Sequence, residues 1–127
     1  MKKMMMLVLI IATICLGCGK KDTDPPRVVT TDPVNGSVDV DPAITEISVT
    51  FNEAMTNQWS WCTEDKETFP QTTGSAYYED GNTKNILPVK LQPGKEYVMW
   101  INLGSHNNFK DKSGNPVVPF KFSFKTK

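Results

Sequence analysis

The feature that most constrains this chain is a strict alternation of apolar and polar residues in short segments. In residues 120–125 every second residue is phenylalanine, and the residues between are lysine or serine. In residues 47–51 isoleucine, valine and phenylalanine alternate with serine and threonine. Successive side chains of a β-strand point to opposite faces, so this pattern predicts strands with one buried and one hydrated face. No segment after residue 18 shows a useful helical period, and the sequence therefore predicts an all-β domain.

Turns that contain glycine or proline separate the predicted strands. Asn35-Gly36 and the segments 79–82 and 92–95 carry residues that tight turns favour. The strands expected between such signals cover residues 27–31, 44–51, 59–63, 75–78, 87–91, 96–103 and 120–125. About seven short antiparallel strands in roughly 100 residues are typical of an immunoglobulin-like β-sandwich.

Pro88 lies inside one of these predicted strands. Proline has no N–H to donate to a neighbouring strand, so it is confined to sheet edges and bulges. The sequence therefore predicts that residues 87–91 form an edge strand or contain a bulge.

The first 17 residues predict a signal peptide that is removed from the mature protein. Lys2 and Lys3 precede an uncharged, largely apolar run at residues 4–16. This run is shorter than the roughly 20 residues that span a bilayer as a helix, but it suits a secretory signal.

The end of this segment resembles a lipobox, the sequence at which lipoprotein signal peptidase cuts. Leucine and Gly17 precede Cys18, and the resemblance implies that the thiol of Cys18 carries a lipid. Lipoboxes usually have leucine three residues before this cysteine, where the chain has Cys15. An ordinary signal peptide is the alternative. Gly19 differs from the aspartate that resembles an inner-membrane retention signal, which favours the outer membrane in a cell with two membranes.

The mature chain is predicted to consist of a tether, residues 18–26, and a sandwich domain, residues 27–127. The tether is polar, carries charges of both signs and ends in two prolines, which stiffen it. Without residues 1–17 the chain has 12 basic and 14 acidic side chains, a net charge of −2. A nucleic-acid-binding protein would show a clustered basic face, so this balance argues against that class.

Cys62 is the one cysteine left to the domain after cleavage and lipidation, so no disulfide is expected. A domain of this size can bury a workable core without one. Free cysteine is usually buried, and Cys62 is predicted to be a small apolar residue in a strand. A reactive thiol or an intermolecular partner is the alternative, and the domain is expected to be a monomer.

Three motifs occur in order along the domain. Residues 25–36 begin Pro-Pro-Arg-Val-Val and end Asp-Pro-Val-Asn-Gly, and residues 47–55 read Ile-Ser-Val-Thr-Phe-Asn-Glu-Ala-Met. Residues 110–126 begin Lys-Asp-Lys-Ser-Gly-Asn-Pro and end Phe-Ser-Phe-Lys-Thr. Together they resemble the bacterial immunoglobulin-like domains of surface-layer and other exported proteins. The resemblance covers residues 25–126 and implies an architecture and an extracellular setting, but no reaction.

A fourth motif, Leu-Gln-Pro-Gly-Lys-Glu-Tyr at residues 91–97, is shared more widely by such sandwiches. It implies that the hydroxyl of Tyr97 bonds to the backbone of the preceding turn. Residues 59–78 match the family less closely, so features particular to this chain are expected there.

Catalytic groups are sparse in this sequence. His106 is the one histidine and stands beside Ser105 in a polar loop, where adjacent residues cannot form a nucleophilic triad. After the predicted loss of Cys15 with the signal peptide, no histidine or cysteine pair of the mature chain has zinc-ligand spacing. The acidic residues gather in two groups: Glu64, Asp65 and Glu67, and Glu79 and Asp80. These are predicted to be solvated surface charges rather than a glycosidase pair, so no enzyme activity and no cofactor are expected.

Asp111, Ser113 and Asn115 alternate like the ligands of a calcium loop. The glycine and proline nearby are misplaced for such a loop, and its closing acidic position falls on Phe122. The sequence therefore predicts a turn stabilised by the Asp111 side chain, and no metal site.

Four aromatic residues are the candidate binding residues. Trp59 and Trp61, two apart on a predicted strand, would share a face about 7 Å apart. With Tyr77 and Tyr78 they could form a flat platform on which a sugar ring or an apolar side chain stacks. The alternative is that at least one tryptophan belongs to the core, as in many immunoglobulin-like domains.

The sequence thus favours a non-enzymatic, lipid-anchored module of the cell envelope. It would contact the membrane through the lipid on Cys18 and bind an envelope glycan or a protein partner, with no nucleic acid and no metal. A purely structural spacer without a specific ligand is the alternative, and a small hydrolase is the least favoured reading.

Overall fold

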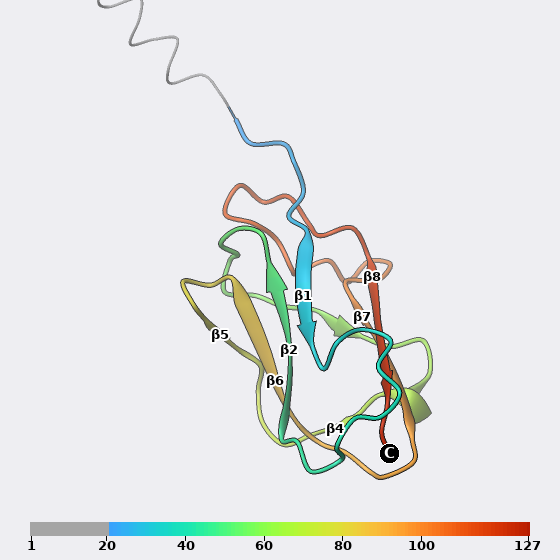
Figure 1. The fold of residues 1–127 in the computed structure, drawn as a ribbon. Coiled ribbons are helices and arrows are strands. Elements are labelled where there is room, and N and C mark those ends of the chain that lie inside the picture. Colours follow the sequence, from blue (N-terminus) through green and yellow to red (C-terminus); the bar gives the residue numbers. More distant parts are fainter. Residues whose placement is uncertain (1–20) are drawn as a thin grey trace, which may run out of the picture.

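The computed structural model describes residues 21–127, which form two antiparallel sheets packed face to face (Figure 1). The larger sheet contains β1 (Val28–Asp32), β2 (Glu46–Phe51), β4 (Gln71–Thr72), β5 (Tyr77–Glu79) and β6 (Lys84–Lys90). The smaller sheet contains β3 (Trp61–Cys62), β7 (Glu96–Ile101) and β8 (Phe120–Lys125), and a short 3-10 helix, η1 (Lys66–Thr68), joins β3 to β4. The predicted signal peptide and Cys18 lie outside the described residues.

The predicted all-β sandwich is confirmed. In the larger sheet β2 pairs with β1 and β6, and β6 pairs on its other side with β4 and β5. In the smaller sheet β7 lies between β3 and β8. Within residues 21–127 no helix is both long and apolar enough to cross a membrane.

Pro88 lies in β6, which is an inner strand rather than the predicted edge strand. Its nitrogen faces the side on which the neighbouring strand is interrupted, because the next amide, that of Val89, points to β2 and bonds to Thr45. On that side β5 pairs with residues 84–86 of β6, and β4 pairs with residues 89–90. Pro88 lies in the gap between these two partners. The missing N–H of Pro88 therefore costs the sheet no hydrogen bond. The irregularity that proline requires is the break between β4 and β5.

The core lies between the sheets in two adjoining clusters. The first includes Tyr97, Phe122 and Phe124, all almost fully buried, and the second is built around Phe51 and Phe109. The rings of Phe51 and Phe109 are 5.4 Å apart and tilted, and those of Phe122 and Phe124 are 5.7 Å apart. The alternating pattern of β8 is reproduced, with two of its phenylalanines buried and its lysines exposed.

Tyr97 closes the turn before β7, as the motif at residues 91–97 implied. The backbone N–H of Gln92 donates to the Tyr97 hydroxyl at 2.8 Å. The ring of Tyr97 is buried in the first core cluster. The hydroxyl thereby satisfies the Gln92 amide of the turn.

The outer edge of β8 is covered by the segment that precedes β2. Here the side chain of Asn35 replaces a peptide group: its Oδ1 accepts from the Ser123 N–H at 2.9 Å and its Nδ2 donates to the Lys121 carbonyl at 3.3 Å. Beyond Asn35, main-chain hydrogen bonds join residues 36–40 to residues 123–127 of β8 and the chain after it. The predicted Asn35-Gly36 turn is present and joins the two sheets.

Candidate functional site

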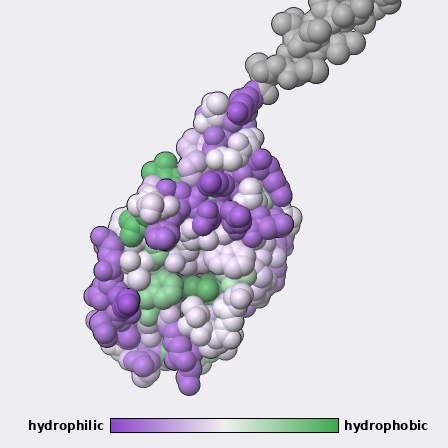
Figure 2. Space-filling model, turned by 180° about the vertical axis from the view of Figure 1, so that it is seen from behind, coloured by the Kyte–Doolittle hydropathy of each residue, from purple (hydrophilic) through white to green (hydrophobic). Residues whose placement is uncertain are grey.

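A groove of about 620 Å³ opens where the edge of β3 faces the interrupted edge of the larger sheet. It is lined by residues 59–63, Phe69, Thr72, residues 74–76, Leu87, Leu103, His106 and Asn108. We refer to this set as the groove. It falls in the region of the sequence that matches the motifs least closely, and it contains both candidate tryptophans. The face on the side of the smaller sheet is otherwise mostly hydrophilic, with small separate apolar areas (Figure 2).

Trp59 stands at the mouth of the groove, with 37% of its side chain exposed. The chain around it is held by long-range hydrogen bonds. The hydroxyl of Tyr78 donates to the Gln58 carbonyl at 2.6 Å, and the Asn108 N–H donates to Ser60 Oγ at 3.0 Å. The residues on both sides of the indole, Gln58 and Ser60, are therefore held in place.

Trp61, in contrast, is directed into the sandwich. Its Nε1 donates to Asn85 Oδ1 at 2.8 Å. Its ring centroid lies 5.9 Å from that of Phe109, in a T-shaped pair, and 6.4 Å from that of Phe122. The prediction that Trp59 and Trp61 share one face of a strand is wrong, because β3 begins at Trp61 and Trp59 precedes it. One tryptophan is at the surface and the other packs against the core.

The two tyrosines do not join Trp59 in a flat platform. They are consecutive in β5, so their side chains point to opposite faces of the sheet. Tyr78 packs against the second core cluster, and burial raises the pKa of its hydroxyl. Tyr77 is 40% exposed and donates to Glu46 at 3.2 Å. Tyr78 thus positions the loop that carries Trp59, and Tyr77 lies outside the groove.

The groove brings together polar residues that the sequence had not connected. Ser60, Ser75 and Asn108 line it together with His106, which is exposed as predicted. No carboxylate, lysine or arginine of the described residues is among the lining side chains. The lining is therefore aromatic and aliphatic, with neutral hydrogen-bonding groups between.

Cys62 also faces the groove and is half-buried, less than predicted. Its Sγ lies 3.5 Å from the Ser60 carbonyl oxygen and 4.0 Å from that of His106. Burial raises the pKa of the thiol, which keeps it protonated at neutral pH. This arrangement gives no activated nucleophile.

Asp111 forms the predicted side-chain-stabilised turn. It is fully buried, and its Oδ1 accepts from the backbone N–H groups of Ser113 and Asn115, both at 2.9 Å. Asn115 also donates from Nδ2 to Asp111 Oδ2 at 3.0 Å. The amide of Asn115 thus presents a donor to the carboxylate, which is the arrangement of a turn and not of a calcium loop.

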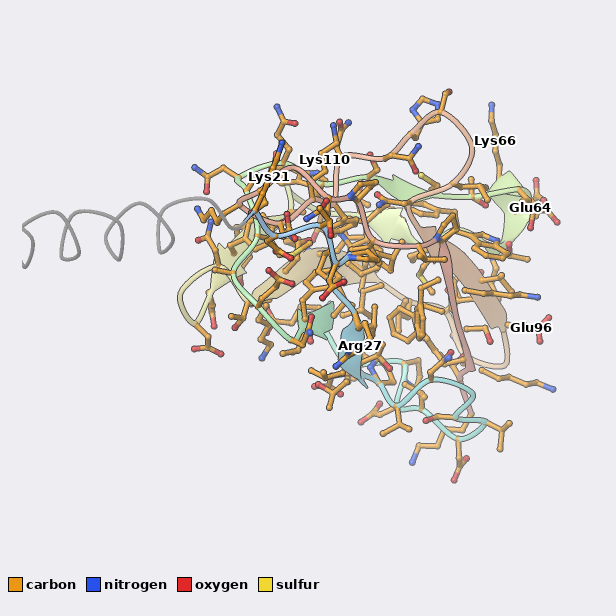
Figure 3. All side chains as sticks on the ribbon, turned by 90° about the horizontal axis from the view of Figure 1, so that it is seen from above. Lys21, Arg27, Glu64, Lys66, Glu96 and Lys110 are labelled. Carbon is orange, nitrogen blue, oxygen red and sulfur yellow. The ribbon has the colours of Figure 1, made fainter. Side chains whose placement is uncertain are left out.

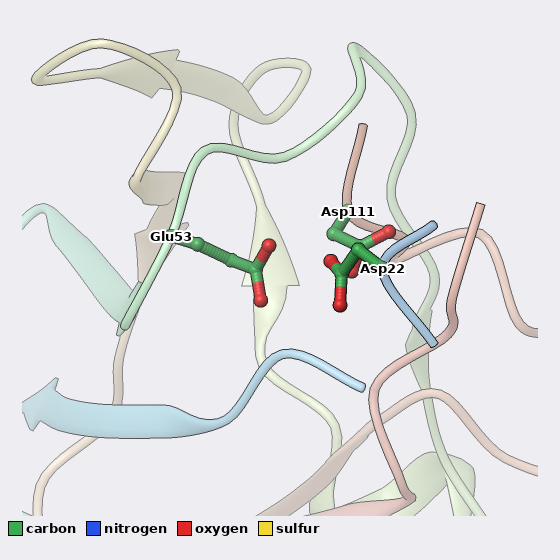
Figure 4. Close-up of side chains that lie close together, drawn as sticks. All are labelled: Asp22, Glu53 and Asp111. Atoms are coloured by element: carbon green, nitrogen blue, oxygen red, sulfur yellow. The ribbon is translucent and has the colours of Figure 1, made fainter. Parts of the chain in front are cut away.

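Three carboxylates from distant parts of the chain meet beside this turn (Figure 4). Asp22, Glu53 and Asp111 each offer one oxygen, and these oxygens lie within 4.8 Å of one another. This acidic cluster is the one group of the described residues with the spacing to hold a metal ion. Its members lie too far apart in sequence for any motif to reveal it.

The pKa values in the cluster move in opposite directions. Loss of hydration and then repulsion from Asp111 and Asp22 raise the pKa of Glu53. Burial alone would raise the pKa of Asp111 too, but hydrogen bonds from Asn115 and Ser113 lower it. Charge on Glu53 therefore opposes folding, and charge on Asp111 favours it.

Glu53→Gln is expected to raise the melting temperature at pH 7 by about 1–4 °C, the range for a charge interaction near the surface. A raised pKa in the folded state means that stability falls as pH rises through it, so the gain should vanish in acid, where Glu53 is already neutral. Thermal unfolding at pH 3 and pH 7 measures this. Glu67→Gln, an exposed glutamate outside the cluster, is the control, and a lower melting temperature for Glu53→Gln at pH 7 would contradict the assignment.

The family that the sequence matches agrees with this architecture. Residues 22–126 match the family described as bacterial Ig-like domain. No curated protein matches the chain. The crystal structure of the S-layer protein rSbsC(31-844) is similar with a TM-score of 0.43 and 17% sequence identity, over 80% of this chain and 14% of that chain. The structure of surface layer protein SbsC, domains 1-6, gives the same values.

This chain therefore spans about a seventh of the length of those surface-layer structures. The family match extends over almost all described residues and begins at Asp22, inside the segment predicted as a tether. The chain belongs to the bacterial Ig-like domain family.

Proposed function

We propose that this protein is a non-enzymatic module of the bacterial cell envelope that binds a neutral glycan unit in the groove. A lipid on Cys18 holds it to the membrane, and Gly19 after that cysteine favours the outer membrane in a cell with two membranes. The predicted signal peptide and the family's occurrence in exported proteins support the location. The groove supports the binding.

The observation that carries the proposal is the chemistry of the groove lining. A sugar ring has an apolar face, which stacks on an indole such as that of Trp59, and hydroxyl groups around its rim. Those hydroxyls require neutral donors and acceptors, which Ser60, Ser75 and Asn108 supply. The absence of charged side chains from the described lining does not suit a phosphate or a charged peptide.

The support of the loop strengthens this interpretation. Binding costs less when the contact residues are already ordered. Bonds from Tyr78 and Asn108 hold the residues on both sides of Trp59, so little freedom is lost when a ligand stacks on the ring.

Trp59→Ala is expected to weaken binding to neutral oligosaccharides by about tenfold or more, because it removes the stacking surface. Calorimetric titration of residues 22–127 with glucose, mannose and N-acetylglucosamine oligomers measures this. Tyr77→Ala is the matched control, since Tyr77 has nearly the same exposure, 40% against 37%, and lies outside the groove. The glycan proposal fails if the wild-type domain binds none of these oligomers, or if Trp59→Ala binds as the wild type does.

A spacer without a specific ligand is the second candidate, and absence of any binding would favour it. A protein strand added to a sheet edge is less well supported at β8, because residues 35–40 already occupy that edge. Turnover of any oligosaccharide in the titration would instead support a hydrolase.

A further inference from the structure

We infer that the end of the domain that carries Asp22 rests on the membrane surface, with Val118 and Pro119 in contact with the phospholipid interface. The inference depends on the proposed lipid at Cys18. The inference rests on the short length of chain between Cys18 and Asp22, where the domain begins to hold the chain in place.

The chain is fixed to the domain earlier than the sequence suggested. The side chain of Asn115 donates to the Asp22 carbonyl at 3.1 Å, and the Arg27 N–H donates to Asn52 Oδ1 at 2.7 Å. Pro26, between these two points, is buried. Residues 22–26, predicted as part of a free tether, therefore lie against the domain.

Three residues remain between Cys18 and Asp22. Even fully extended, these four steps of the chain reach about 14 Å. A lipid-bearing cysteine sits at the level of the head groups, so Asp22 must stay within that distance of the membrane. The domain cannot turn this end away while the contacts of Asp22 and Arg27 are intact.

The end of the domain that carries Asp22 exposes apolar side chains to its surroundings. A cleft of about 780 Å³ is lined by Pro25, Pro26, Val117, Val118 and Pro119 together with the acidic residues nearby. Val118 is 68% exposed, and Pro119 beside it is also exposed. Exposed apolar side chains suit the interfacial region of a bilayer.

Charge at this end is mixed, so it does not select anionic lipid. Figure 3 looks down on this end and labels Lys21, Arg27 and Lys110. Asp22 and Glu53 lie at the same end, in the acidic cluster. Contact with the interface therefore depends on the apolar residues, and the short anchor makes a weak contact effective by keeping it at high local concentration.

The test uses the full lipidated chain in vesicles of phosphatidylethanolamine and phosphatidylglycerol. In a Cys62→Ser background a fluorophore is attached at Val118→Cys or at Val38→Cys, and quenching by a head-group spin-labelled lipid is measured. Val38 is the matched control, because it is 72% exposed and lies next to Lys125, at the end of β8 opposite Phe120. Quenching at position 118 is expected to be several-fold stronger than at position 38.

Inserting 20 glycine and serine residues between Lys21 and Asp22 should lower quenching at position 118 to the level at position 38. Equal quenching at the two positions without the insertion would overturn the inference, and so would strong quenching that the insertion leaves unchanged. Mass spectrometry of the N-terminal peptide separates these results from failure of the anchor. A chain without acyl groups on Cys18 refutes the anchor itself, and the inference falls with it.

Discussion

Asn102→Ala is expected to lower the free energy of unfolding by about 3–4 kcal/mol. Asn102 is fully buried at the end of β7, and its amide makes three hydrogen bonds. Nδ2 donates to the carbonyls of Phe109 and Val117 at 3.0 Å each, and Oδ1 accepts from the Phe109 N–H at 3.0 Å. Alanine would leave backbone groups of the 104–119 loop buried without partners.

The backbone at Asn102 adds a second cost. Its φ of 62° lies in the left-handed region, which asparagine tolerates better than alanine does. Asn102→Gly loses the same hydrogen bonds but relieves this strain, so it should be about 1 kcal/mol less destabilised than Asn102→Ala. Urea unfolding followed by circular dichroism measures both variants.

Asn107→Ala is the control for the Asn102 variants, because Asn107 is half-buried in the same loop and makes one exposed bond, to the Gly104 carbonyl. Its effect should stay below about 1 kcal/mol. An Asn102→Ala domain as stable as the Asn107→Ala domain would show that the loop does not depend on the buried amide. Because this loop carries His106 and Asn108, loss of Asn102 should also weaken ligand binding in the groove.

Trp61→Ala is expected to lower the free energy of unfolding by about 3 kcal/mol, near the lower limit for a large aromatic residue because the side chain is half-buried. The substitution leaves a cavity beside Phe109 and Phe122 and removes the donor to Asn85. Asn85 is fully buried, and its Nδ2 has no partner among the described residues. Its side chain would then lose its one bond.

Trp59→Ala provides the contrast, with an expected change within about 0.5 kcal/mol, typical of a surface position. Trp61→Phe should recover part of the packing but not the hydrogen bond to Asn85. Equilibrium unfolding in urea measures all three variants. Equal losses for Trp59→Ala and Trp61→Ala would contradict the division of the two tryptophans between surface and core.

The sequence predicted the strands that have one wet face. β8 has the expected bounds, and β2 and β7 differ from expectation by two residues at one end. Their alternation is strong because one face of each strand packs on the core. On the other face of β2, Ser48 is nevertheless buried as well. The corner at Tyr97 could also be anticipated, since turn and tyrosine are close in sequence.

The site could not be predicted in the same way. The stretch at residues 59–63 alternates like a strand, yet the bonds that Ser60 makes to Asn102 and Asn108 hold it as a loop up to Trp61. Such bonds depend on the folded neighbours and leave no local pattern. The two tyrosines are different: consecutive residues in a strand cannot share a face, so the sequence already argued against a platform containing both.

The covered edge of β8 bears on how copies of the domain behave when crowded. An open strand with phenylalanines on one face would be a template on which another chain could add and start an aggregate. From the Lys121 carbonyl to the Lys127 amide, the outward backbone groups of this strand are bonded to residues 35–40. Copies of the domain that meet at high concentration therefore cannot pair through this edge of β8.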